Sequence, residues 1–259
     1  MRRASVAAAV VAALALAGAL TASGRAEEAT PEPPRQTWSF DGVFGTYDRA
    51  ALQRGFQVYK DVCSACHAVR HLYFRDLVDL GYSEDQVKGI AAQYQVNDGP
   101  NEQGQMFQRP GRPADRIPGP FPNDEAARAA NNGALPPDLS LITKAREGGP
   151  DYVAAILTGF KDQPPQGFKL MEGMYYNEYF PGHQIKMPPP LSADQVKFAD
   201  GTPATVPQMA HDVVSFLAWA AEPTLEARHR MGFKVILFLV IATGVFYAAK
   251  RKIWSRIQH

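Results

Sequence analysis

Cys63, Cys66 and His67 are the residues whose types and spacing point most directly to chemistry. They form a Cys-x-x-Cys-His motif in the stretch VCSACHAV, which holds both cysteines of the 259-residue chain. This spacing is typical of c-type haem attachment. Two thiols three residues apart can each form a thioether with one of the two haem vinyl groups, and the adjacent histidine can ligate the iron. The motif therefore predicts one covalently bound haem c.

Three other roles of a Cys-x-x-Cys pair fit this sequence less well. A thioredoxin-like redox pair normally belongs to a βαβ pattern, which is absent here. A zinc site would need a second pair of ligands, and the chain has no further cysteines. A structural disulfide would be tight at this separation and would leave His67 without a role. Haem attachment accounts for all three residues.

A haem iron held by His67 has a second axial position, and the sequence favours Met187 for it. A methionine ligand raises the reduction potential relative to a second histidine. Met187 lies directly before three prolines (residues 188–190), which restrict it to extended backbone and stiffen the segment. His183, four residues earlier, is the main rival. The remaining candidates are Met106, Met171, Met174, Met209, His71 and His211.

The helices expected around the motif are typical of class I cytochromes c. Residues 47–62 place Leu52, Phe56, Tyr59 and Val62 on one face, with Asp48 as a possible N-cap. Gly55 in this helix could let a late helix approach closely. The other soluble helices are expected over residues 83–95, which open with a capping-box pattern, 151–158 and 205–221.

Long loop-rich stretches separate these helices, at residues 97–138 and 159–204. Glycine and proline together number 42. A long loop inside a compact domain is usually functional or wrapped around something. The sequence therefore predicts a mainly α fold with long loops, in which the haem itself forms the centre of the core.

The two ends of the chain have membrane-related patterns. Arg2 and Arg3 precede an Ala-rich apolar stretch, which is typical of a secretory signal peptide. Residues 232–249 are apolar except for Lys234 and would span about 27 Å as a helix, close to the roughly 30 Å of a hydrocarbon core. The expected organisation is a signal peptide (1–26), an exported haem domain (27–226), a transmembrane anchor (227–250) and a cytoplasmic tail (251–259).

The charge of the predicted exported domain differs from that of the whole chain. The chain has a formal charge of +1, but residues 27–226 hold all 26 acidic residues and 17 of the 27 basic ones, which leaves −9. This balance argues against a nucleic-acid partner and suits a basic protein partner that is steered electrostatically. Glu84 and Asp85 are candidates for an acidic docking face because they begin an expected helix. Simple solubility would also explain the charge.

Four stretches together resemble the cytochrome c1 family, the haem c subunits of bacterial-type cytochrome bc1 complexes. They are VCSACH, MFQRPGRPADRIPGPFPNDEAARAANNGALPPDLSLI, YFPGHQIKMPPPL and the C-terminal anchor. The likeness covers essentially the whole mature chain. It implies Met187 as the sixth iron ligand opposite His67, and Arg128 near a haem propionate. Some bacterial relatives also carry a further cysteine pair that pins a loop, which this chain lacks.

The resemblance implies an electron-transfer subunit that needs no catalytic acid, base or nucleophile. It would take single electrons from a Rieske iron–sulfur protein and pass them to a soluble c-type cytochrome, in a complex with cytochrome b. The haem domain is expected on the periplasmic side of the bacterial inner membrane, with the C-terminus in the cytoplasm. The alternatives are an anchored cytochrome c of another dehydrogenase or oxidase, and a haem sensor or enzyme with an open sixth position.

Overall fold

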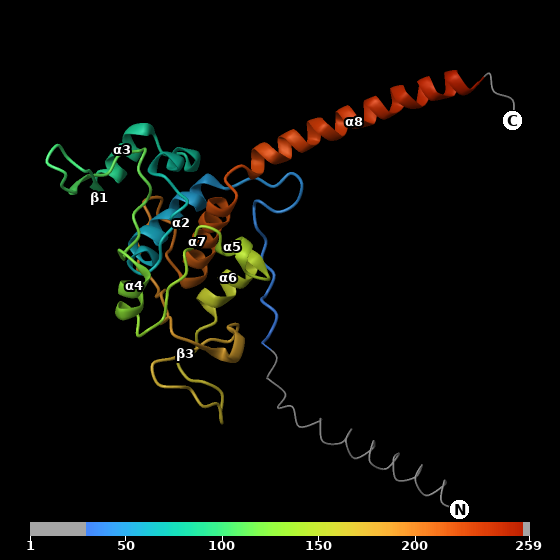
Figure 1. Cartoon of the computed structure of the whole chain (residues 1–259). Coiled ribbons are helices and arrows are strands. Elements are labelled where there is room, and N and C mark those ends of the chain that lie inside the picture. Colours follow the sequence, from blue (N-terminus) through green and yellow to red (C-terminus); the bar gives the residue numbers. More distant parts are fainter. Residues whose placement is uncertain (1–29, 256–259) are drawn as a thin grey trace, which may run out of the picture.

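A computed structural model describes residues 30–255 (Figure 1). The predicted signal peptide and residues 256–259 of the predicted tail lie outside this range. The helices are α2 (Arg49–Asp61), α3 (Glu84–Ala91), α4 (Asp124–Ala130), α5 (Ile142–Ala145), α6 (Gly149–Thr158), α7 (Val206–Ala221) and α8 (Leu225–Trp254), with short 3-10 helices η1 (Cys63–Ala65), η2 (Phe74–Leu80) and η3 (Pro181–His183). Two antiparallel pairs join β1 (Gln95–Asp98) to β2 (Phe107–Pro110), and β3 (Tyr175–Tyr176) to β4 (Gln184–Ile185). The prediction of a mainly α fold with long loops is confirmed.

The first and last helices of the domain, α2 and α7, pack against each other in the core, as predicted. The apolar face of α2 is buried at Leu52, Phe56 and Tyr59, and Asp48 caps the helix by accepting from two backbone N–H groups. Gly55 makes the contact between the helices possible. A Cβ added there would lie 2.0 Å from the backbone oxygen of Asp212 on α7, so only glycine fits at this crossing.

A buried ion pair joins the same two helices. The Arg54 guanidinium donates to both carboxylate oxygens of Asp212, over 2.7 and 3.0 Å, and the Asp212 side chain is fully buried. Burial alone would raise the pKa of Asp212, but hydrogen bonds from His211, Arg54 and Gln208 outweigh it and hold the pKa below its ordinary value. Asp200, at a more exposed position, also pairs with Arg54 over 2.8 Å.

Replacing Asp212 by asparagine is expected to lower the free energy of unfolding by about 2 kcal/mol at pH 7, because it removes charge-assisted hydrogen bonds at a buried position. The folded-state pKa is depressed, so this stabilisation is present above the unfolded pKa of about 4 and is lost as the pH falls below it. Chemical unfolding in detergent at pH 7 and at lower pH measures both effects. Asp200→Asn is the control, with a much smaller expected change. An equal loss in both variants would contradict this account.

The segment from residue 95 to 138 is more ordered than its composition predicts. The predicted helix over 83–95 has its capping box at Ser83 and Gln86 but ends at Ala91. The chain then enters the β1–β2 hairpin, which projects from the domain (Figure 1). Arg109 on β2 pairs with Asp98 and, over 2.6 Å, with Asp115. These pairings lie outside any regular helical spacing, so the hydrophobic period of the sequence does not reveal them.

Residues 30–40 form an extended arm before α2, which packs onto the domain through Trp38. Its indole nitrogen donates to the Asp151 carboxylate on α6 over 2.7 Å, and its ring stacks on His211 with centroids 4.7 Å apart. His211 is therefore a partly exposed helix residue beside the arm. Met209, two residues earlier on α7, is fully buried in the core.

The C-terminal helix α8 leaves the domain as a single continuous rod (Figure 1). It has 30 residues, and it is the described helix that is long and apolar enough to cross a membrane. Its length of about 45 Å exceeds a hydrocarbon core of about 30 Å. The helix continues through Trp254, past residue 250 where the anchor was predicted to end.

Polar contacts fix the junction between α8 and the domain. Glu226, in the first turn of α8, accepts from the Tyr47 backbone N–H over 2.9 Å and pairs with Arg49 over 3.1 Å. The Tyr47 hydroxyl donates to the carbonyl groups of Ala218 and Glu222 at the end of α7, over 3.2 and 3.1 Å. The start of α8 is thus tied to the start of α2 and the end of α7.

Candidate functional site

Cys63, Cys66 and His67 lie together in a tight turn at the end of α2. The helix stops after Asp61, and the Ser64 hydroxyl donates to the Lys60 carbonyl over 2.7 Å, which satisfies one of its last acceptors. The backbone N–H groups of Cys66 and His67 both donate to the Cys63 carbonyl, over 3.1 and 2.9 Å. The turn therefore brings the two thiols and the imidazole to one end of the helix, as the spacing predicted.

The His67 ring is held in the tautomer that suits an iron ligand. Its Nδ1 lies 2.8 Å from the Pro137 carbonyl oxygen. A carbonyl can only accept, so Nδ1 carries the proton and the Nε2 lone pair is left for a metal. Burial lowers the pKa of His67, although the Pro137 contact and Asp138 act in the opposite direction. The imidazole is therefore neutral at neutral pH, which is the form that ligates metals.

The environment of Cys63 argues against a redox-active thiol pair. Burial, together with nearby Cys66, raises the pKa of the Cys63 thiol to about 12. Redox and zinc-binding cysteines act as thiolates and need environments that lower this pKa. No group of three or more histidine, cysteine or acidic side chains in residues 30–255 is arranged to hold a metal ion. Thioether attachment needs no standing thiolate, so it fits this environment best.

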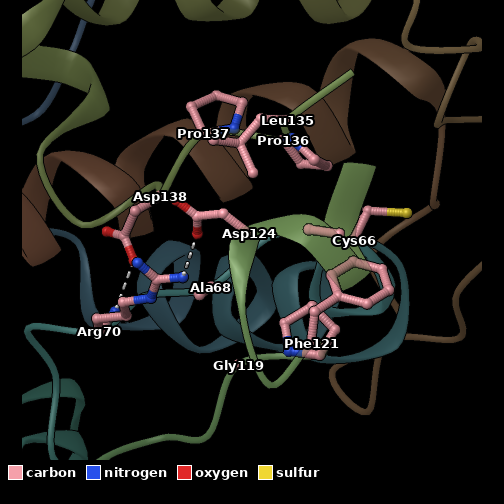
Figure 2. Close-up of a pocket in the computed structure, with 12 residues that line it drawn as sticks. Cys66, Ala68, Arg70, Gly119, Phe121, Asp124, Leu135, Pro136, Pro137 and Asp138 are labelled. Atoms are coloured by element: carbon pink, nitrogen blue, oxygen red, sulfur yellow. Dashed lines mark hydrogen bonds and ion pairs between the residues drawn. The ribbon is translucent and has the colours of Figure 1, made fainter. Parts of the chain in front are cut away.

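The segment that orients His67 lies alongside the residues just after the motif. The Leu139 N–H donates to the Ala68 carbonyl over 2.8 Å, and the Arg70 N–H donates to the Asp138 carboxylate over 2.9 Å. A pocket lies between these two stretches. Figure 2 shows Cys66, Phe121 and the Pro136–Pro137 pair around it. Cys66 of the motif therefore faces the apolar side chains of Phe121, Pro136 and Pro137, and hydrogen bonds from Leu139 and Arg70 hold the two stretches together.

Arg128 lies in the last turn of α4, on the same long segment. Its side chain is exposed, and its guanidinium is 3.5 Å from the Gly133 carbonyl oxygen. Within residues 30–255, no acidic side chain lies within ion-pair distance of the Arg128 guanidinium. The guanidinium is thus available to an anionic group from outside the chain.

Contacts just before Met187 hold the loop that carries it. Before it, β3 pairs with β4, and the buried Asn177 side chain donates to the Ile156 carbonyl of α6 over 2.8 Å. The Lys186 ammonium donates to the Asn132 carbonyl over 3.0 Å. Met187 itself is half-buried. The Met187 loop therefore contacts Asn132, and His67 contacts Pro137, five residues further along the same stretch.

The rival ligand His183 lies inside an aromatic cluster. Its ring stacks on Tyr176 with centroids 5.7 Å apart and meets Phe168 edge-on at 6.3 Å. The side chain is buried, and its Nδ1 has no hydrogen-bond partner among the described residues. This packing gives His183 a structural role beside Met187.

The other candidate ligands lie in places that suit other roles. Met209 is a core residue of α7, while Met106 and Met171 are exposed in loops. His71 is exposed and bound through its backbone to Ser140. Met174 is half-buried in the turn before β3. Met187 as the second iron ligand stays a prediction.

The main features missed from the sequence are backbone contacts. The Pro137 carbonyl that orients His67 and the Asn132 carbonyl that binds Lys186 carry no side-chain signature. The stretch RAANNGALPPDL, which contains both, was distinctive only as part of a family resemblance. The buried Asn177 could have been noticed as a polar residue within an apolar, aromatic stretch.

Comparison with known proteins gives a consistent result. The sequence profile described as "Cytochrome C1 family" matches residues 38–257. The chain is 48% identical to cytochrome c1 of Rhodospirillum rubrum, covering 100% of this chain and 98% of that protein. It is 51% identical to a mitochondrial cytochrome c1 heme protein of Arabidopsis thaliana, covering 86% and 73%. A Bradyrhizobium diazoefficiens protein named cytochrome b/c1 is 53% identical over 97% of this chain, which spans 40% of that protein's length.

Proposed function

This chain belongs to the cytochrome C1 family, and from that premise we propose that it is the electron-transfer subunit of a cytochrome bc1 complex, with one covalently bound haem c. It would accept single electrons from a Rieske iron–sulfur protein and pass them to a soluble c-type cytochrome. The observation that carries the proposal is the Cys63-x-x-Cys66-His67 turn, in which the Pro137 carbonyl leaves His67 Nε2 as the free ligand atom.

The residues of this chain fit such a cofactor. When bound, haem c supplies one-electron redox chemistry at its iron. Cys63 and Cys66 would attach it, and His67 and Met187 would ligate its iron. The Pro137 carbonyl fixes the His67 ring, and its hydrogen bond increases the electron donation from His67 Nε2. Phe121 and Pro136 would give it apolar neighbours on this side. The protein's contribution is thus to attach, orient and shield the redox centre.

Covalent attachment is tested by staining for haem on a denaturing gel. The wild-type chain is expected to keep its haem after denaturation, at one haem per chain by a pyridine haemochrome assay. The double variant Cys63→Ser, Cys66→Ser should lose all of the stain, because no thioether can form. Ser64→Ala changes a residue between the two cysteines and should keep the stain. Retention of covalent haem by the double variant would refute the attachment.

Arg128 is proposed to lie near a haem propionate, because its guanidinium is free of acidic partners in the described structure. Replacing it with glutamine is expected to lower the midpoint potential, since a nearby positive charge disfavours the oxidised haem. The change should stay below the roughly 60 mV that corresponds to a tenfold effect on a one-electron couple. A redox titration measures it. Arg146→Gln, an exposed arginine at the end of α5, should leave the potential unchanged; an equal shift would contradict the assignment.

The proposal also includes the partners of the chain and its location in the membrane. Helix α8 would anchor the chain in the bacterial inner membrane, with the haem domain in the periplasm and residues after α8 in the cytoplasm. Glu84 and Asp85 are exposed at the start of α3, as predicted, and they could belong to an acidic docking face for a basic soluble cytochrome. Purification of the anchored chain should bring down cytochrome b and a Rieske protein. Their absence would favour an anchored cytochrome c of another complex.

A further inference from the structure

A short loop beside the membrane helix exposes two large apolar side chains. Residues 41–45 (Asp-Gly-Val-Phe-Gly), which we name the 41–45 loop, connect the arm to α2. Val43 and Phe44 at its tip are 75% and 83% exposed. Phe44 is the most exposed of the large apolar residues described, including those on α8. Adjacent apolar side chains exposed to this degree are costly in water and indicate a contact outside the chain.

The loop is held rigidly in this exposed position. At its base, Thr46 N–H donates to the Ser39 carbonyl over 3.0 Å and Asp41 N–H donates to the Trp38 carbonyl over 3.1 Å. The turn closes with a hydrogen bond of 3.2 Å from Gly45 N–H to the Gly42 carbonyl. A Cβ at Gly45 would lie 2.2 Å from the Phe40 backbone oxygen, so the tight closure depends on glycine. The tip cannot fold back onto the domain without breaking this base.

The same loop lies against the start of α8. His229 Nδ1 is 3.3 Å from the Gly45 carbonyl, and Figure 1 shows the blue loop reaching alongside the first turns of the red helix. The exposed apolar surface of α8 begins at Met231 and Phe233, two and four residues after His229. At 1.5 Å per residue this is about 3 to 6 Å further along the helix axis. The tip therefore lies at the level where the apolar part of α8 begins.

We propose that the 41–45 loop inserts Val43 and Phe44 into the interface of the lipid bilayer that α8 crosses. The proposal rests on the membrane anchoring proposed above. Lipid is the occupant that the surroundings favour, because Arg230 is exposed on the same turns of α8, as is Arg228, which also pairs with Glu222. Basic side chains next to apolar ones suit phosphate headgroups above acyl chains. With α8, the loop would give the haem domain a second point of contact that limits its tilt over the membrane.

A photoreactive lipid tests the insertion. The full haem-loaded chain is reconstituted in phosphatidylcholine vesicles with a lipid whose diazirine lies near the glycerol, and adducts are mapped by mass spectrometry. Adducts are expected both on α8 and on the peptide containing Val43 and Phe44. The double variant Val43→Ser, Phe44→Ser should reduce the loop adducts several-fold while those on α8 persist. Met171, 56% exposed near β3 at the far end of the domain, is the internal control and should carry none (Figure 1).

The outcomes separate the loop from the anchor. Adducts on α8 without adducts on the loop would overturn the insertion and leave the anchor in place. Absence of adducts on α8 would overturn the anchoring itself, and with it the insertion. Equal labelling of Met171 and Phe44 would show non-specific reaction and reject the inference. Loss of loop labelling when co-purified subunits are present would assign the tip to a protein partner instead of lipid.

Discussion

Replacing Met187 by leucine is expected to lower the midpoint potential sharply while the haem stays attached. Leucine has a similar volume but no sulfur, so the loop can keep its packing while the axial ligand is lost. A methionine ligand raises the potential of a haem. Its loss should lower the midpoint potential by well over the roughly 60 mV that corresponds to a tenfold effect on a one-electron couple. Spectroelectrochemical titration of the purified chain measures the change, and the haem stain confirms attachment.

The control for this substitution is Met174→Leu, because Met174 is also half-buried. It lies just before β3, whereas Met187 lies just after β4, the strand that pairs with β3. It should leave the potential unchanged. An unchanged potential in Met187→Leu would move the ligand assignment to His183 or elsewhere. His183→Phe would then be the next variant, since phenylalanine can keep the ring packing against Tyr176 but cannot ligate iron.

Replacing Gly55 by alanine is expected to destabilise the domain by more than about 3 kcal/mol, at the upper end of the cost of overpacking a core. The added Cβ would lie 2.0 Å from the Asp212 backbone oxygen and 2.8 Å from Phe216 Cβ. Both are atoms of α7 that cannot rotate away, so the two central helices must separate. Chemical unfolding followed by far-UV circular dichroism measures the loss.

Gly89→Ala provides a comparison in which the stability of the domain is expected to rise. Gly89 lies in α3, and a Cβ added there meets nothing within 4 Å. Alanine has a higher helix propensity than glycine, so this variant should gain up to about 1 kcal/mol. A loss of stability in both variants, or in neither, would contradict the role given to the Gly55 crossing.

The parts of the fold that sequence alone predicted are those specified by local pattern. The apolar period of residues 47–62, the Asp48 cap and the Ser83–Gln86 capping box all lie within one or two helical turns, and the structure has them. The hairpin at residues 95–110 was missed because its strands are four residues each and are stabilised by pairing and by Arg109. Helix α4 was missed because, of its seven residues, Ala127 alone is fully buried.

The features of the candidate site also divide into those that local sequence predicted and those that it did not. The attachment motif is contiguous in sequence, so its spacing indicated its chemistry directly. Met187 could be favoured because prolines restrict its backbone, but its choice over His183 needed a family resemblance. The contact that fixes the His67 tautomer joins residues 70 positions apart through a main-chain carbonyl. Any residue type has such a carbonyl, so composition and spacing carry no information about it.

The most direct test of the account is the optical spectrum of the reduced, intact chain before and after addition of carbon monoxide. An iron ligated by both His67 and Met187 has no open position for a small ligand. The account predicts a reduced spectrum that carbon monoxide leaves unchanged in the wild-type chain and alters in Met187→Leu. Rapid carbon monoxide binding by the wild-type chain would show an open sixth position, and would contradict the assignment of a closed electron carrier.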